Sequence, residues 1–214
     1  DGDAHAWLDR WHRLRDALAD RSPLVTLGAA LHSVRAVPRE ALGVVARGLD
    51  ASVPLHIHLS EQPAENDDCI AAYGLTPTAL LAAEGVLSPR LSAVHATHLT
   101  EDDIRMLGDA QVTAVFCPTT EADLGDGIGP AVELQAAGAP LAIGSDQNAV
   151  VDPLLELRGL EAGERLRSLR RGRISPADLW RIGAEEGYAS LGLAAPARIG
   201  GPLDLVELDD RSMR

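Results

Sequence analysis

The chain has 214 residues, of which 32 are aspartate or glutamate and 19 are lysine or arginine, so its formal net charge is −13 at neutral pH. So acidic a chain lacks the basic face that neutralises phosphates, which argues against nucleic acid as a partner. No run of apolar residues is long enough to cross a bilayer, so we expect no membrane association. Cys69 and Cys117 are too few and too far apart for a disulfide framework, which favours reduced thiols in the cytoplasm.

Short apolar segments follow one another along the chain, and helical patterns separate them. We predict strands over residues 24–31, 53–59, 91–96, 112–116 and 141–145. Helix starts are marked by a capping box at Thr100 and Asp103, and by cap-and-proline pairs at Asp152 and Ser175. Strands that alternate with helices in this way predict a parallel α/β sheet. An open doubly wound sheet is the alternative, but it usually carries a Gly-rich phosphate loop that is absent here, so we favour a (β/α) barrel.

Polar side chains suited to catalysis stand where these strands end. His58 lies near the end of the second strand with Glu61 three residues later, His95 lies near the end of the third, and Asp146 follows the fifth. An imidazole can bind a divalent cation, and a carboxylate beside it can move protons to and from a bound water. A lone His-x-His is more often a pair of hydrogen-bonded core or rim histidines, so this motif alone is weak. By strand alternation we expect His56 to face away from His58.

Several longer segments resemble known enzymes. They span residues 32–37, 56–62, 94–99, 117–127 and 143–146. These segments resemble the amidohydrolase superfamily and, more narrowly, its formimidoylglutamate deiminase family. Members of that family hydrolyse N-formimidoyl-L-glutamate to N-formyl-L-glutamate and ammonia in histidine degradation. The resemblance covers nearly the whole chain, and the Cys-Pro-Thr-Thr-Glu-Ala-Asp-Leu-Gly-Asp-Gly segment at 117–127 is long enough to be specific.

The resemblance implies a metal-dependent hydrolase with a (β/α)8 barrel and assigns roles to the strand ends. It implies His58 and Asp146 as zinc ligands, Glu61, His95 and Asp146 as catalytic residues, and His32 and Arg35 as substrate-binding residues. Glu61 would act as the proton shuttle, and His95 would stabilise the attacking hydroxide. An arginine can hold a substrate carboxylate through two hydrogen bonds, although without the surrounding motif Arg35 would be taken for a partner of a surface acid. Because the sequence contains no lysine, the carbamylated-lysine bridge of two-metal relatives is excluded and a single ion follows, with iron or manganese as substitutes for zinc.

The five predicted strands match only part of such a barrel. If the last is the eighth strand, the first three are absent, together with the His-x-His pair that the family places on its first strand. We predict an incomplete barrel of strands four to eight over residues 1–193, then a linker and the start of a C-terminal β-sandwich segment over residues 194–214. A catalytic zinc usually has three protein ligands, so we expect the isolated chain to bind metal weakly and to be inactive. For the complete enzyme the resemblance implies a homodimer.

Two other functions stay open. The nearer is another deaminase or hydrolase of the same superfamily, of the cytosine or guanine type, and the farther is an inactive fragment or subunit remnant. His32 and Arg35 discriminate between the acidic substrate and a nucleobase. The chain has three tryptophans, two tyrosines and one phenylalanine. So few aromatic side chains leave little for stacking on a planar base, which favours an aliphatic acid.

Overall fold

The structure, a computed structural model, describes residues 3–19, 21, 25–194, 199–201 and 203–207. Its centre is a parallel sheet whose strands lie side by side in chain order. The strands are β1 (Ala29–Leu31), β2 (Leu55–Leu59), β3 (Leu91–His95), β4 (Thr113–Phe116) and β5 (Leu141–Ile143). The predicted parallel sheet is confirmed, and each strand falls within its predicted segment. The largest difference is at β1, because residues 25–28 are not in a strand and residue 24 lies outside the described residues.

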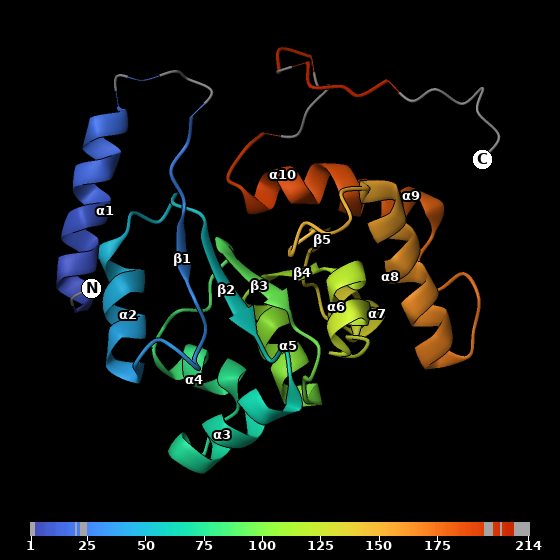
Figure 1. Cartoon of the computed structure of the whole chain (residues 1–214), viewed down its shortest axis with the longest axis horizontal. Helices are drawn as coiled ribbons and strands as arrows, with labels where there is room; N and C mark the ends of the chain where they lie inside the picture. Colours follow the sequence, from blue (N-terminus) through green and yellow to red (C-terminus); the bar gives the residue numbers. More distant parts are fainter. Residues whose placement is uncertain (1–2, 20, 22–24, 195–198, 202, 208–214) are drawn as a thin grey trace.

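Helices follow the strands and surround the sheet (Figure 1). They are α1 (Ala4–Leu18), α2 (Arg39–Gly48), α3 (Pro63–Tyr73), α4 (Pro77–Ala83), α5 (Glu101–Asp109), α6 (Pro118–Leu124), α7 (Ala131–Ala136), α8 (Pro153–Ser168), α9 (Pro176–Arg181), the π-helical turn η1 (Ile182–Glu186) and α10 (Gly187–Ser190). Helices α1 and α2 pack side by side near β1, and α8 and η1 pack near β5 (Figure 1). The chain therefore advances around the sheet from one edge to the other.

The predicted helix starts are confirmed. Thr100 and Asp103 form a capping box at α5, in which each side chain accepts the backbone N–H of the other residue. Asp152 caps α8, and Ser175 caps α9, each followed by a proline at the first helical position. These side chains satisfy backbone donors that have no partner inside the helix.

Strand β2 separates the hydrophobic core from the functional face of the sheet. Leu55, Ile57 and Leu59 are at most 1% exposed and belong to the core, whereas His56 and His58 are half-buried. Both histidines line one cavity of about 480 Å³. The prediction that they face opposite sides is wrong, because side chains two residues apart on a strand point to the same face. His56 Nε2 lies 3.0 Å from the carbonyl oxygen of Ser190, so its ring ties α10 to the sheet.

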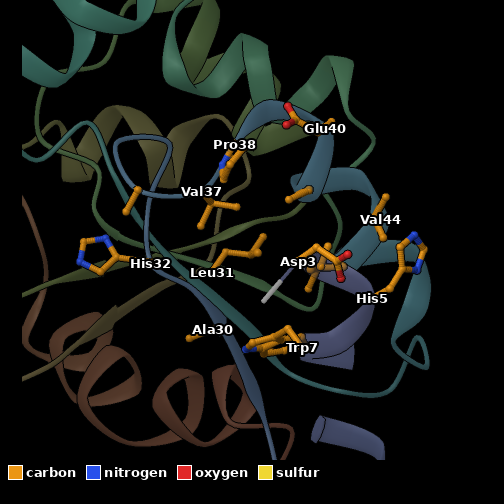
Figure 2. A pocket seen from close by; sticks show the side chains of 14 residues that line it. Asp3, His5, Trp7, Ala30, Leu31, His32, Val37, Pro38, Glu40 and Val44 are labelled. Carbon is orange, nitrogen blue, oxygen red and sulfur yellow. The ribbon is translucent and has the colours of Figure 1, made fainter. Parts of the chain in front are cut away.

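The sheet is part of a barrel. Strands β1 and β5 each pair with one neighbour, and within the described part of the chain no further strand joins them into a closed barrel. A groove of about 570 Å³ lies beyond β1, between α1 and α2. Figure 2 shows Leu31 between Trp7 of α1 and Val37, which precedes α2, and all three line this groove. An unpaired strand edge and an apolar groove therefore lie at the same end of the sheet.

The predicted C-terminal segment has no strand among residues 199–201 and 203–207, and residues 195–198, 202 and 208–214 lie outside the described residues. The domain boundary near residue 194 and the β-sandwich segment stay predictions. Cys69 and Cys117 are both free and buried. None of the helices in the described part of the chain has both the length and the hydropathy of a membrane span.

Candidate metal and catalytic site

The carboxyl ends of the strands bring together the residues singled out from the sequence. His32 follows β1, His58 lies in β2, His95 ends β3, and Asp146 comes three residues after β5. In a parallel sheet these ends share one edge, so side chains more than 100 positions apart in the sequence become neighbours. We expect the chemistry at this carboxyl-terminal edge of the sheet, which is distinct from the side edges formed by β1 and β5.

His58, His95 and Asp146 form a group that could hold a metal ion. Each offers one ligand atom, and these atoms lie within 4.8 Å of one another. His58 Nδ1 lies 2.8 Å from the carbonyl oxygen of His32. Since a carbonyl only accepts, Nδ1 carries the proton and Nε2 keeps a lone pair for a cation, as in many metal-binding histidines. The predicted pair of ligands thus gains a third candidate, His95.

Two imidazoles and a carboxylate suit zinc, and iron or manganese would accept the same donors. Within the group the ring centroids of His58 and His95 lie 5.6 Å apart, with the planes only 15° from parallel. Asp146 is exposed, whereas His95 is 1% exposed. The chemistry of this donor set fits a divalent cation.

The backbone is strained where these side chains leave the strands. Ser60, His95, Ala96 and Asp146 have φ angles of 48°, 73°, 49° and 45°, in the left-handed region that favours glycine. Each such residue costs about 1–3 kcal/mol and persists only where neighbours hold it. Here Ala96 donates its backbone N–H to Leu59, and His98 donates to Ser60. Strain of this kind clusters at functional sites, which supports the assignment of this edge.

Glu61, the predicted proton shuttle, pairs with Arg35. Arg35 Nη2 lies 2.5 Å from Glu61 Oε2, and its Nε lies 3.6 Å from Glu65 Oε2. Burial by itself would raise the pKa of Glu61, but the hydrogen bond from Arg35 and the nearby His95 and Arg35 charges hold it below its ordinary value. Glu61 is therefore ionised at neutral pH, and it can accept a proton before it delivers one.

His95 lies between two carboxylates. Its Nδ1 is 3.3 Å from Glu121 Oε1, and its Nε2 is 3.9 Å from Glu61 Oε1. Burial by itself would lower the pKa of His95, but the hydrogen bond with Glu121 and the charges of Glu61, Glu121 and Asp146 raise it above its ordinary value. The ring can carry a positive charge here, which suits a group that stabilises developing negative charge.

His32 and Arg35, predicted to bind substrate, both lie at this edge. The ring of His32 is 5.2 Å from that of His58, and its Nδ1 is 2.9 Å from Ser33 Oγ. Both His32 and Arg35 are exposed, so both are accessible to a ligand. In the structure Arg35 is engaged by the carboxylates of Glu61 and Glu65, in line with the alternative that it pairs with an acid.

Sequence reasoning missed two buried acids, Glu65 and Glu121. Glu65 accepts the backbone N–H of Glu61 at 3.1 Å, and Glu121 accepts that of Cys117 at 2.8 Å. Each stands near the start of its helix, where an acid is ordinarily explained by the helix dipole. No signal in the sequence separates that ordinary reason from a position at the site.

The structure thus combines part of a parallel barrel with a strand-end group that fits a divalent cation, and comparison with known proteins gives the family. The model of the amidohydrolase family matches residues 1–197, so the chain belongs to this family. Formimidoylglutamate deiminase of Pseudomonas aeruginosa is 37% identical over 98% of the chain, which spans 46% of that protein.

Relatives with other substrates are also similar. The 5-methylthioadenosine/S-adenosylhomocysteine deaminase of Pyrococcus furiosus is 32% identical over 80% of the chain and 42% of that protein. A crystal structure of an adenosine deaminase from Xanthomonas campestris with bound zinc superposes with a TM-score of 0.80, at 30% identity over 87% of this chain and 43% of the other. The chain thus spans less than half the length of these relatives.

Proposed function

We propose that this chain belongs to an enzyme that hydrolyses N-formimidoyl-L-glutamate to N-formyl-L-glutamate and ammonia in histidine degradation. The observation that carries the proposal is the guanidinium of Arg35 beside Glu61, at an edge otherwise lined by carboxylates and imidazoles. A cation there suits a substrate that carries carboxylates. The similarity to a formimidoylglutamate deiminase over nearly the whole chain supports the same substrate.

The candidate ligands would hold a cation at the strand ends, with His58 and Asp146 as the proposed zinc ligands. A divalent cation bound there would lower the pKa of a coordinated water to about 7 and so supply hydroxide at neutral pH. Asp146 would accept the proton that the water loses. His95 would stabilise negative charge that develops at the reacting carbon.

Glu61 would deliver a proton to the departing nitrogen, which must leave as ammonia. Because its pKa is held below the ordinary value, Glu61 begins ionised and would take up its proton from the hydroxyl group of the tetrahedral adduct, which becomes the formyl oxygen. Arg35 and His32 would hold the glutamate moiety, and Arg35 would at the same time keep Glu61 in place. Binding would then set the distance between the proton donor and the formimidoyl carbon.

The second candidate is a deaminase that acts on a nucleobase or nucleoside. The relative from Pyrococcus furiosus and the zinc-bound neighbour from Xanthomonas campestris, both named for such substrates, favour it. The small number of aromatic side chains argues against it, because planar bases are commonly held by stacking. A cytoplasmic location and a homodimer of the complete protein stay predictions.

The test measures ammonia release by the chain, and by any longer protein that contains it, with zinc supplied. N-formimidoyl-L-glutamate, adenosine, guanine and cytosine are compared in parallel. We expect release from the acidic substrate in the longer protein and its loss on treatment with a chelator. Turnover of a nucleobase or nucleoside in place of N-formimidoyl-L-glutamate would overturn the proposal.

The variant Arg35→Ala tests more directly whether the substrate is acidic. Loss of a charged partner costs about 2 kcal/mol or more, so kcat/KM for the acidic substrate should fall at least about 30-fold, with a rise in KM. The control is Arg105→Ala, which removes an exposed arginine that pairs with Asp102 in the same helix. An Arg35→Ala variant with normal KM for N-formimidoyl-L-glutamate would favour the nucleobase alternative.

A further inference from the structure

The ring of His95 is buried between two carboxylates. It is 1% exposed, with Nδ1 at 3.3 Å from Glu121 Oε1 and Nε2 facing Glu61 Oε1 at 3.9 Å. The two carboxylates come from different elements, because Glu121 lies in α6 and Glu61 follows β2. The identity of the nitrogen that carries the proton therefore decides what the ring presents to the site.

Glu121 is itself fixed by the backbone. It is 5% exposed, and the oxygen that faces His95 also accepts the N–H of Cys117 at 2.8 Å. Cys117 is the residue between β4 and α6, so the carboxylate joins the ends of β3 and β4. At the start of the same helix, Thr119 donates its N–H and hydroxyl to Glu156 of α8. A carboxylate anchored in this way can set the orientation of a neighbouring ring.

An ionised carboxylate accepts hydrogen bonds and cannot donate them. We propose that Glu121 is a positioning residue that keeps the proton of His95 on Nδ1 and directs Nε2 toward Glu61, His58 and Asp146. In the opposite tautomer a lone pair on Nδ1 would face the Glu121 oxygen at 3.3 Å, which is closer than the 3.9 Å between Nε2 and the Glu61 oxygen. The proposal rests on the proposed function only in giving His95 a task in the site, since the geometry at Nδ1 exists without a substrate.

The same side chains could be read as a second metal site. One ligand atom each from His95, Cys117 and Glu121 lies within 4.8 Å of the others. Two observations oppose that role. The facing oxygen of Glu121 already accepts the backbone N–H of Cys117, and burial raises the pKa of the Cys117 thiol far above its ordinary value, away from the thiolate that metals bind.

The test reads the tautomer of His95 by long-range ¹H–¹⁵N correlation NMR on the chain as it stands, at a pH where the imidazoles are neutral. Its signals are identified by their absence in His95→Gln. We expect the Nδ1–H form in the wild type and in Glu121→Gln, whose amide oxygen still accepts. In Glu121→Ala the ratio of Nδ1–H to Nε2–H should fall about tenfold, because a hydrogen bond to a charged group is lost.

Glu156→Ala is the matched control. It removes another buried carboxylate that holds the start of α6 but does not contact the ring, so the His95 signals should not change. An equal response in Glu121→Ala and Glu156→Ala would reduce Glu121 to a helix cap and overturn the proposal. If Glu121→Ala does not fold, the wild-type spectrum decides, because an Nε2–H tautomer there is incompatible with the proposal.

Addition of Co²⁺ distinguishes a metal site at His95, Cys117 and Glu121 from the proposed hydrogen bond between His95 and Glu121. A cobalt–thiolate absorption band that disappears in Cys117→Ser would show metal at the buried cluster and overturn the proposal. Its absence supports the hydrogen-bonded arrangement. Since none of these measurements uses a substrate, failure of the ammonia assay would leave this result unchanged.

Discussion

Glu65 shows how a buried acid supports the turn that carries Glu61. The side chain of Glu65 is 0% exposed, its Oε2 accepts the N–H of Glu61, and Arg35 lies 3.6 Å from the same oxygen. Its Oε1 is buried and has no hydrogen-bond partner among the described residues. Burial raises the pKa of Glu65 above its ordinary value, so ionisation of this acid works against folding.

This raised pKa fixes the sign of a stability change. Between the ordinary pKa and the raised value the folded chain binds the extra proton and the unfolded chain does not, so stability falls as the pH rises through this window. Glu65→Gln keeps an acceptor for Glu61 and removes the ionisation. We expect its free energy of unfolding at neutral pH to equal or exceed that of the wild type, with a weaker pH dependence.

Urea denaturation at several pH values measures this prediction. Glu65→Ala is the companion variant, and loss of the acceptor for the N–H of Glu61 should destabilise it by about 1–3 kcal/mol. If Glu65→Gln is as unstable as Glu65→Ala at neutral pH, the ionised form of Glu65 is needed for folding and the argument from burial fails.

Helix α8 shows the same use of a buried acid between elements. Glu161 is 6% exposed, and it accepts the backbone N–H groups of Gly172 and Ile174 as well as the Nε of Arg165. It thus holds the connection that leads into α9. Burial by itself would raise the pKa of Glu161, but the hydrogen bonds from Arg165 and Ile174 lower it below its ordinary value.

We therefore predict the opposite acid response for this residue. With a lowered folded pKa, Glu161 contributes stability that is present above its ordinary pKa and is lost as the pH falls through the folded value. Glu161→Ala should lower the free energy of unfolding by about 1–3 kcal/mol at neutral pH, and the difference from the wild type should shrink in acid. Asp67→Asn, at an exposed position of α3, is the control and should stay within about 0.5 kcal/mol. A difference that stays constant down to strongly acid pH would contradict the assignment.

The elements differ in how far the sequence could predict them. Strands and helix caps were predictable, because apolar runs and the Thr100 and Ser175 caps act locally. The burial of Glu65 and Glu121 at the site was not predictable. In the sequence, an acid that becomes buried cannot be distinguished from an acid that only stabilises the start of a helix. The prediction for His56 was an error of reasoning. Side chains alternate along a strand, so residues two apart, such as His56 and His58, must lie on the same face.

At the scale of the whole molecule, the sheet has two edges that pair with nothing in the described part of the chain. β1 and β5 are three residues long, and short edges offer few groups for pairing with another chain. Beside β1 the groove in Figure 2 adds an apolar surface between α1 and α2. Asp146, which follows β5 at the carboxyl ends of the strands, is itself exposed.

The exposure of Asp146 and the small number of candidate ligands lead to a prediction about the isolated chain. His58, His95 and Asp146 offer at most three ligands, and Asp146 is exposed to water that competes with the cation. We expect weak zinc binding and no detectable ammonia release from N-formimidoyl-L-glutamate by the purified chain.

Zinc affinity is measured by competition with a chromogenic chelator, with His58→Asn as the variant and His5→Asn, on the exposed surface of α1, as the control. We expect His58→Asn to weaken zinc binding by about 100-fold or more, because loss of a group that merely supports a ligand already costs about 10–100-fold. His5→Asn should leave the zinc affinity unchanged. Ammonia release by the chain alone at a rate that zinc restores after chelation would show that the strand ends described here suffice for catalysis, and that the open edges carry no part of the site.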